Sequence, residues 1–135
     1  MPDRKDFPVS WLAAIAALTA AGVGASRAQM PLPAAVKPTG ADLFNQQCAA
    51  CHSLNPADPP RQGPLLAGVY GRKPGSIASF RYSPGYDKAD FSWDETHLDL
   101  YLTDPQTVIP GSMMLYKQKN VDTRKAIIAF LKEQK

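Results

Sequence analysis

The chain has 135 residues, a formal net charge of +3 and no long run of lysine or arginine. A charge this small excludes a nucleic-acid-binding protein that works through a basic surface. The length suits one domain once a targeting segment is set aside, because about a hundred residues remain after residues 1–28. A chain of that size builds only a modest core, so a bound group with a large apolar face would add stability.

The N-terminal segment has the pattern of an export signal. Residues 9–25 are apolar and rich in alanine, a length that suits the hydrophobic region of a signal peptide and is short for a membrane-spanning helix. Ser26 and Ala28 then provide small residues at the −3 and −1 positions of a cleavage site. We therefore expect residues 1–28 to be a signal peptide. The alternative is an N-terminal membrane anchor that is never cleaved, and either one exports the domain.

A linker and one domain are expected after this segment. Residues 29–39 contain three prolines and are predicted to be an extended linker. The domain then covers residues 40–135, in which three helices are predicted: 40–48, 92–104 and 122–135. Their inward-facing residues follow from helical spacing: Leu43, Phe44 and Gln47; Leu98, Tyr101 and Leu102; Ile127, Phe130 and Leu131.

Helix-capping signals set the predicted boundaries. Ser92 begins an S-x-x-E capping box, Asp104-Pro105 ends the same helix, and Asp122 is a plausible N-cap for the last helix. Glycine, proline and serine dominate the segments between helices, and no stretch alternates long enough to predict a sheet. The prediction is an all-α domain whose long loops wrap a prosthetic group.

The two cysteines carry the chemistry. Such a pair can be a redox dithiol, half of a zinc site or a haem attachment. Zinc requires four ligands, usually with a second close Cys or His pair, and the only other histidine is the isolated His97. A thioredoxin-like dithiol belongs to a chain that alternates strands and helices, a pattern this sequence lacks. Cys48-Ala49-Ala50-Cys51-His52 is the C-x-x-C-H pattern of covalent c-type haem attachment, in which His52 ligates the iron.

A second axial ligand must come from elsewhere in the chain. The candidates are Met30, Met113, Met114 and His97. The two adjacent methionines follow Pro110-Gly111-Ser112, and a thioether ligand favours reduced iron, which suits an electron carrier. A methionine more often fills a gap in a core, but a pair on this loop beside a haem favours ligation. We expect His97 to be an exposed side chain on a polar helix flank.

With these residues in place, residues 40–132 resemble the class I cytochromes c, the mitochondrial carrier and its soluble bacterial relatives. The resemblance implies the cytochrome c fold, with about three to five short helices and long loops around one covalent haem. It also implies that the first and last helices cross at Gly40, where Phe44 and Phe130 pack together.

The same resemblance implies roles for further residues. The carbonyl of Pro64 accepts the ring N–H of His52, Tyr101 lies near the sulfur of the methionine ligand, and that ligand is Met114. Three residues are placed near the haem propionates, where a partly buried carboxylate needs donors or a cation: Arg72, Tyr82 and Trp93. The lysines that surround the haem edge in the eukaryotic carrier are partly replaced here, and Met113 and Tyr116 suggest a more apolar docking surface.

The predicted function is that of a periplasmic single-electron carrier and not of an enzyme. Its expected partners are a quinol-oxidising complex, a terminal oxidase, a photosynthetic centre or a dehydrogenase. The carrier is expected to be monomeric and to contact the membrane only if the N-terminal segment stays uncleaved. A dedicated electron-accepting subunit of a periplasmic dehydrogenase is the alternative. A peroxidase-like or gas-binding protein requires an open sixth position, which the methionine pair argues against.

Overall fold

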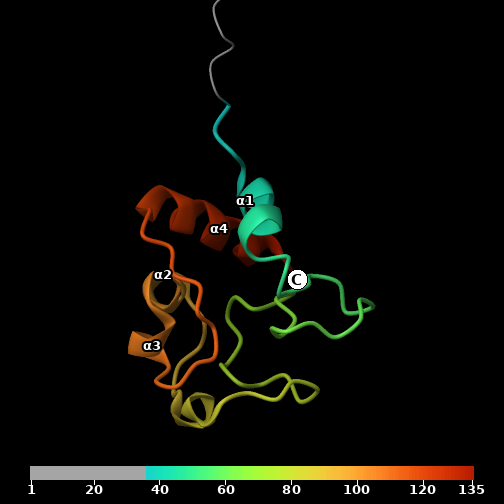
Figure 1. The fold of residues 1–135 in the computed structure, drawn as a ribbon, viewed down its shortest axis with the longest axis vertical. Helices are drawn as coiled ribbons and strands as arrows, with labels where there is room; N and C mark the ends of the chain where they lie inside the picture. Colours follow the sequence, from blue (N-terminus) through green and yellow to red (C-terminus); the bar gives the residue numbers. More distant parts are fainter. Residues whose placement is uncertain (1–35) are drawn as a thin grey trace, which may run out of the picture. The chain divides into compact units, whose positions relative to one another are not determined.

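The computed structural model describes residues 36–135, so the predicted signal peptide and most of the predicted linker lie outside the described residues. The elements, in chain order, are α1 (Gly40–Gln47), the short 3₁₀-helix η1 (Pro84–Lys88), α2 (Glu95–Thr103), α3 (Pro105–Val108) and α4 (Val121–Glu133) (Figure 1). Residues 36–135 contain no strand, so the predicted all-α fold is confirmed. Within this range, no helix is both long and apolar enough to cross a membrane.

Helices α1 and α4 pack against each other at Gly40, as predicted (Figure 1). A Cβ at Gly40 would lie 2.3 Å from the carbonyl oxygen of Ala126 and 2.7 Å from the Cβ of Phe130. The rings of Phe44 and Phe130 meet beside this contact, with centroids 5.5 Å apart. Because a larger residue at position 40 would push the helices apart, the glycine allows the first and last helices to close the fold.

The predicted start of α2 is wrong. The helix begins at Glu95, and its N-cap is Asp94, whose carboxylate accepts a hydrogen bond from the backbone N–H of His97. Ser92 cannot cap the helix because Trp93, the next residue, is not helical and its backbone N–H and carbonyl pair with Arg72 and Gly71.

Two further boundary predictions need correction. The N-cap of α4 is Asn120, which accepts from the N–H of Thr123, while Asp122 lies in the first turn. There its negative charge favours the positive end of the helix dipole. Pro105 ends α2, as predicted, but it also begins α3 within the predicted loop. Its fixed φ and missing N–H suit the first position of a helix.

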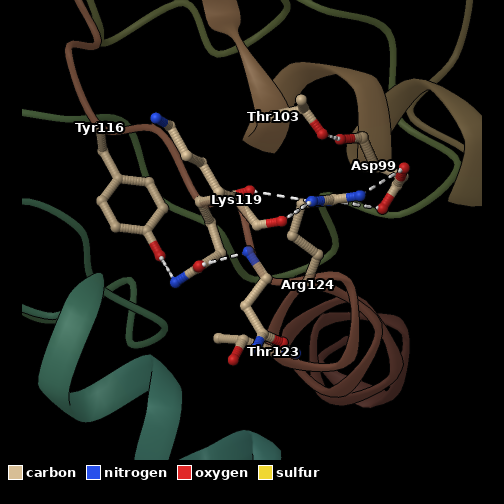
Figure 2. Close-up of polar contacts among 8 residues, drawn as sticks. Asp99, Thr103, Tyr116, Lys119, Thr123 and Arg124 are labelled. Carbon is tan, nitrogen blue, oxygen red and sulfur yellow. Dashed lines mark hydrogen bonds and ion pairs between the residues drawn. The ribbon is translucent and has the colours of Figure 1, made fainter.

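The predicted core is largely confirmed. Of the inward-facing residues, all but two are buried, and Gln47 and Phe130 are half-buried. Helices α2 and α4 are joined by Arg124, which is only 7% exposed. Its guanidinium forms an ion pair with Asp99 at 2.7 Å and donates to the carbonyls of Gln118 and Lys119 (Figure 2). Arg124 therefore fixes the segment before α4 as well as the helix pair.

Candidate haem site

The cysteines and His52 lie on the turn that follows α1. The backbone N–H groups of Cys51 and His52 both bond to the carbonyl of Cys48, at 3.0 and 2.9 Å. Both cysteines are free thiols and half-buried. Burial raises the pKa of Cys48 to about 11, and the nearby Cys51 contributes to the rise. The thiol of Cys48 therefore stays protonated at neutral pH, and the same turn carries Cys51 and His52.

The imidazole of His52 is held in one orientation. Its Nδ1 lies 2.8 Å from the carbonyl oxygen of Pro64. A carbonyl only accepts, so Nδ1 carries the proton and Nε2 keeps its lone pair for a metal. Burial lowers the pKa of His52, an effect that the bond to Pro64 partly opposes, so the ring is neutral. Gly63 lies against this ring, because a Cβ there would be 2.3 Å from Cε1 of His52.

The two methionines face opposite ways. From 112 to 119 the chain forms no helix, and burial alternates along it. Met113 is 85% exposed, whereas Met114 is half-buried and packs against the core. A burial period of two places neighbouring side chains on opposite sides of the chain, and of the two methionines only Met114 lies on the buried side. The residues that share its inward face are Ser112, Tyr116 and Gln118.

Tyr101 and Ser112 form a buried hydrogen-bonded pair at the start of residues 112–119, which we call the methionine segment. The hydroxyl of Tyr101 lies 2.7 Å from Oγ of Ser112 and 2.5 Å from the hydroxyl of Tyr86. Burial raises the pKa of Tyr101 well above its ordinary value, although the bond to Ser112 lowers it somewhat. The phenol therefore stays protonated and able to donate. The Oγ of Ser112 also accepts from the backbone N–H of Met114, at 3.3 Å.

Arg72 and Tyr82, two of the predicted propionate-binding residues, lie near each other. The guanidinium of Arg72 donates to the carbonyls of Leu65 and Ala67, at 2.8 and 2.7 Å. Burial lowers the pKa of Arg72 and raises that of Tyr82, and each group acts on the other to oppose its shift. Beside Tyr82, the Oγ of Ser83 is buried and has no hydrogen-bond partner among residues 36–135. An unpaired buried hydroxyl suits an acceptor such as a propionate.

Trp93 lies on the same side of the fold as Tyr101. It is buried, and its ring meets that of Tyr101 edge to face, with centroids 4.8 Å apart. His97 is half-buried and not exposed as predicted, because its ring stacks on Phe91 at 4.1 Å and its Nδ1 lies 2.7 Å from Asp94. These contacts give His97 a structural role beside the helix cap.

Sequence reasoning missed Tyr86, Ser83, Ser112 and Arg124. Tyr86 follows Ser83-Pro84-Gly85, a pattern that predicts only a loop, so nothing in it indicates that the Tyr86 hydroxyl meets that of Tyr101. Ser112 enters the sequence prediction only as part of the loop before the methionines. Arg124 follows a predicted N-cap and has the spacing of an ordinary surface residue. A partner far away in the sequence determines the role of each of these residues, except for Ser83, which has no partner among the described residues.

The all-α fold, the paired thiols and the oriented imidazole define a c-type haem protein. Consistent with this class, the family model for cytochrome c matches residues 38–135. The chain therefore belongs to the cytochrome c family. Members of this family carry electrons and are not enzymes, and their haem is bound covalently to the two cysteines of the C-x-x-C-H motif.

Three relatives illustrate the range of the family. The chain is 49% identical to cytochrome c2 iso-2 of Magnetospirillum molischianum over 89 residues, and this alignment covers 65% of this chain and 91% of that protein. It is 38% identical over 102 residues to cytochrome c2 of Rhodomicrobium vannielii, covering 75% and 82% respectively. It is 41% identical over 95 residues to cytochrome c of Theileria annulata, covering 70% and 82%.

Proposed function

We propose that the protein carries single electrons in the periplasm with a haem ligated by His52 and Met114. The observation that carries this proposal is the hydrogen bond from Nδ1 of His52 to Pro64, which leaves Nε2 directed away and unprotonated. When bound, the haem supplies an iron that alternates between the ferrous and ferric states. The protein supplies attachment, orientation and a closed coordination sphere.

Each ligating residue has a separate task. Cys48 and Cys51 hold the porphyrin by thioether bonds, and the carbonyl of Pro64 keeps the ring of His52 in place and makes Nε2 more basic. Met114 supplies the thioether, supported by its half-buried position and by the outward direction of Met113. A methionine ligand raises the reduction potential, which suits a carrier in a respiratory or photosynthetic chain.

Donors at the propionates complete the proposed site. Arg72 provides a cation, and Tyr82 and Trp93 provide an O–H and an N–H. The unpaired hydroxyl of Ser83 supports this assignment, because it is a buried donor for which the described residues offer no acceptor. Pairing the propionates in this way lowers the cost of holding two carboxylates partly out of water.

A small apolar surface next to Met114 suits a transient redox partner. Met113 and Leu115 are 85% and 84% exposed on either side of it, and Lys117 and Lys119 follow on the same outward face. Electron transfer requires only a small, short-lived interface. The proposed partners are a quinol-oxidising complex on one side and a terminal oxidase, photosynthetic centre or dehydrogenase on the other.

The absorption spectrum of the oxidised protein tests this function. A methionine bound to ferric haem gives a weak charge-transfer band at the red end of the spectrum, and we expect the purified holoprotein to show it. We also expect slow binding of cyanide, because the sixth position is filled. A missing band together with rapid cyanide or carbon monoxide binding would contradict the carrier and favour a gas-binding or peroxidase-like protein.

Mass spectrometry of the exported protein tests its location. We expect a chain that begins at Gln29 and carries the mass of one haem, recovered from the periplasmic fraction. An intact N-terminus in the membrane fraction would establish the anchor instead of the signal peptide. Electron transfer between the same partners is compatible with either result, so this measurement separates location from function.

A further inference from the structure

The two neighbouring methionines present their sulfur atoms to different surroundings, and they are the only methionines among residues 36–135. Met113 is 85% exposed, whereas Met114 is half-buried and packs against the core. A thioether sulfur reacts with oxidants to give a sulfoxide, so accessibility determines which of the two is attacked. In the proposed site, the sulfur of Met114 also gives a lone pair to the iron. Met113 is therefore the more reactive of the two thioethers.

The backbone on either side of Met113 is held by hydrogen bonds. Before it, the N–H of Gly111 donates to Oε1 of Gln106, at 3.0 Å. After it, the N–H of Gln118 donates to the carbonyl of Leu102, at 2.7 Å. Because the chain is anchored to the fold on both sides, the outward direction of Met113 is a feature of the fold itself. The exposed sulfur therefore belongs to a defined surface of the protein.

Met113 shares this surface with Leu115. Leu115 is 84% exposed, and the burial period of two places it on the same side of the chain as Met113. Lys117 follows on this side, but its charge is paired with the carboxylate of Asp104, at 2.7 Å. The apolar character of the surface thus depends on two side chains. Of these two, Met113 is the one that contains a group open to oxidation.

We propose that Met113 is a site of reversible oxidation that weakens docking of the redox partner. The inference rests on the proposed function, in which Met113 and Leu115 face an apolar surface of that partner. Hypochlorous acid, as the oxidant, leaves one oxygen on the sulfur and takes two electrons from it, while chloride and a proton are released. The sulfoxide is polar, and a reductase that takes two electrons from thiols returns it to the thioether and water. Oxidation thus makes the docking surface polar and leaves both iron ligands in place.

An equimolar dose of hypochlorous acid, added to the ferric holoprotein, tests which methionine reacts. Mass spectrometry with fragmentation of the peptide that contains both methionines locates the added oxygen, and the charge-transfer band reports the iron ligand. We expect sulfoxide at Met113, little at Met114, and a band that keeps its intensity. Sulfoxide that forms at Met114 as fast as at Met113, or a band that falls in step with oxidation of Met113, would overturn the proposal.

Adsorption to a gold electrode coated with a methyl-terminated alkanethiol layer measures the effect on docking. The layer represents an uncharged, apolar partner surface, and voltammetry quantifies the adsorbed haem. We expect half-coverage to require a protein concentration about three- to tenfold higher after oxidation, a change comparable to losing the burial of about one methylene group or slightly more. Methionine sulfoxide reductases for both sulfoxide epimers, supplied with dithiothreitol, should restore the original value. A loss that they do not reverse would show damage elsewhere and overturn the proposal.

Met113→Leu is the matched control, because leucine is apolar and does not form a sulfoxide. Its adsorption before and after the oxidant should be the same, whereas Met113→Gln should adsorb weakly without any oxidant, since glutamine is polar and of similar length. Equal losses in the wild type and in Met113→Leu, or wild-type adsorption by Met113→Gln, would overturn the proposal while the carrier function stands. If the untreated wild type lacks the charge-transfer band, the proposed ligation fails. This inference then fails with it, because no iron shields the sulfur of Met114.

Discussion

The two sides of the haem site are built in different ways. On the histidine side, the ring of His52, one of the two proposed ligands, is fixed by a direct hydrogen bond from its Nδ1 to Pro64, twelve residues further along the chain. On the methionine side, the side chain that is proposed to ligate packs against the core, and the hydrogen bonds go to its backbone instead. The groups that fix it come from η1, α2 and the segment after α3. One proposed ligand is held locally and the other by the tertiary structure.

This difference follows from the chemistry of the ligands. An imidazole has a second nitrogen that can donate to a carbonyl, so one short segment both supplies and orients it. A thioether has no such second group. Its segment is therefore fixed at both ends, by Ser112 at the start and by Arg124, which binds the carbonyls of Gln118 and Lys119, at the other. The histidine side should tolerate distant substitutions better than the methionine side.

The largest effect is expected when a cysteine that attaches the haem on the histidine side is replaced. Cys48→Ala or Cys51→Ala leaves one thiol, so neither variant can form both thioether bonds, and we expect little or no stable holoprotein. Ala50→Ser is the control, because it changes an exposed residue between the two cysteines. Mass spectrometry after denaturation detects bound haem. A single-cysteine variant that retained as much covalent haem as Ala50→Ser would refute the assignment of the motif.

The next effect compares the two methionines. Met114→Ala should abolish the charge-transfer band and accelerate cyanide binding by about tenfold or more, a change in barrier of about 1.4 kcal/mol. Met113→Ala should retain the band, because that side chain is 85% exposed. A band that survives in Met114→Ala and disappears in the double variant would show that Met113 can take its place. A band lost in Met113→Ala alone would reverse the assignment.

Replacing Arg124 tests how much the contacts at the far end of the methionine segment contribute to stability. Arg124→Met keeps the aliphatic stem but leaves the carboxylate of Asp99 and two carbonyls without their donor. We expect a loss of about 2–4 kcal/mol in the free energy of unfolding, measured by denaturant unfolding of the holoprotein. Lys125→Met, at an exposed position of the same helix, should have little effect. Equal losses in the two variants would show that the ion pair contributes nothing specific.

The same contrast explains what the sequence could predict. The attachment motif is a short spacing and could be predicted from the residues alone. The Pro64 contact and the crossing at Gly40 were predicted through the resemblance to the class I cytochromes c. The capping box at Ser92 failed because Trp93 pairs with the chain near Gly71, a contact more than twenty residues away. Tyr86 and Arg124 were missed for the same reason. Local chemistry is visible in a pattern, whereas contacts between distant segments, such as the crossing at Gly40, were predicted only where the resemblance implied them.

The smallest expected effect concerns the pH dependence of one ion pair on the methionine side. The carboxylate of Asp104 lies 2.7 Å from Nζ of Lys117, in the segment that follows Met114. This hydrogen bond lowers the pKa of Asp104 below its ordinary value of 3.8, and the backbone N–H of Gln106 adds to the effect. Because the pKa is lower in the folded state, the contribution to stability is present above pH 3.8 and is lost as the pH falls through the lowered value.

Asp104→Asn tests this dependence without removing the N-cap of α3, since asparagine caps helices about as well as aspartate. We expect a small loss of stability at pH 7 that shrinks in strongly acidic solution and in high salt, because water and salt screen an exposed pair. Asp90→Asn, which removes an exposed carboxylate with no ion pair among residues 36–135, is the control. Denaturant unfolding at both pH values gives the difference. A loss that stayed constant with pH would mean that the charge of Asp104 contributes nothing and that its uncharged contacts account for the effect. The ion pair of Arg124 with Asp99 would then be the one charged interaction left among the described residues to hold the far end of the methionine segment.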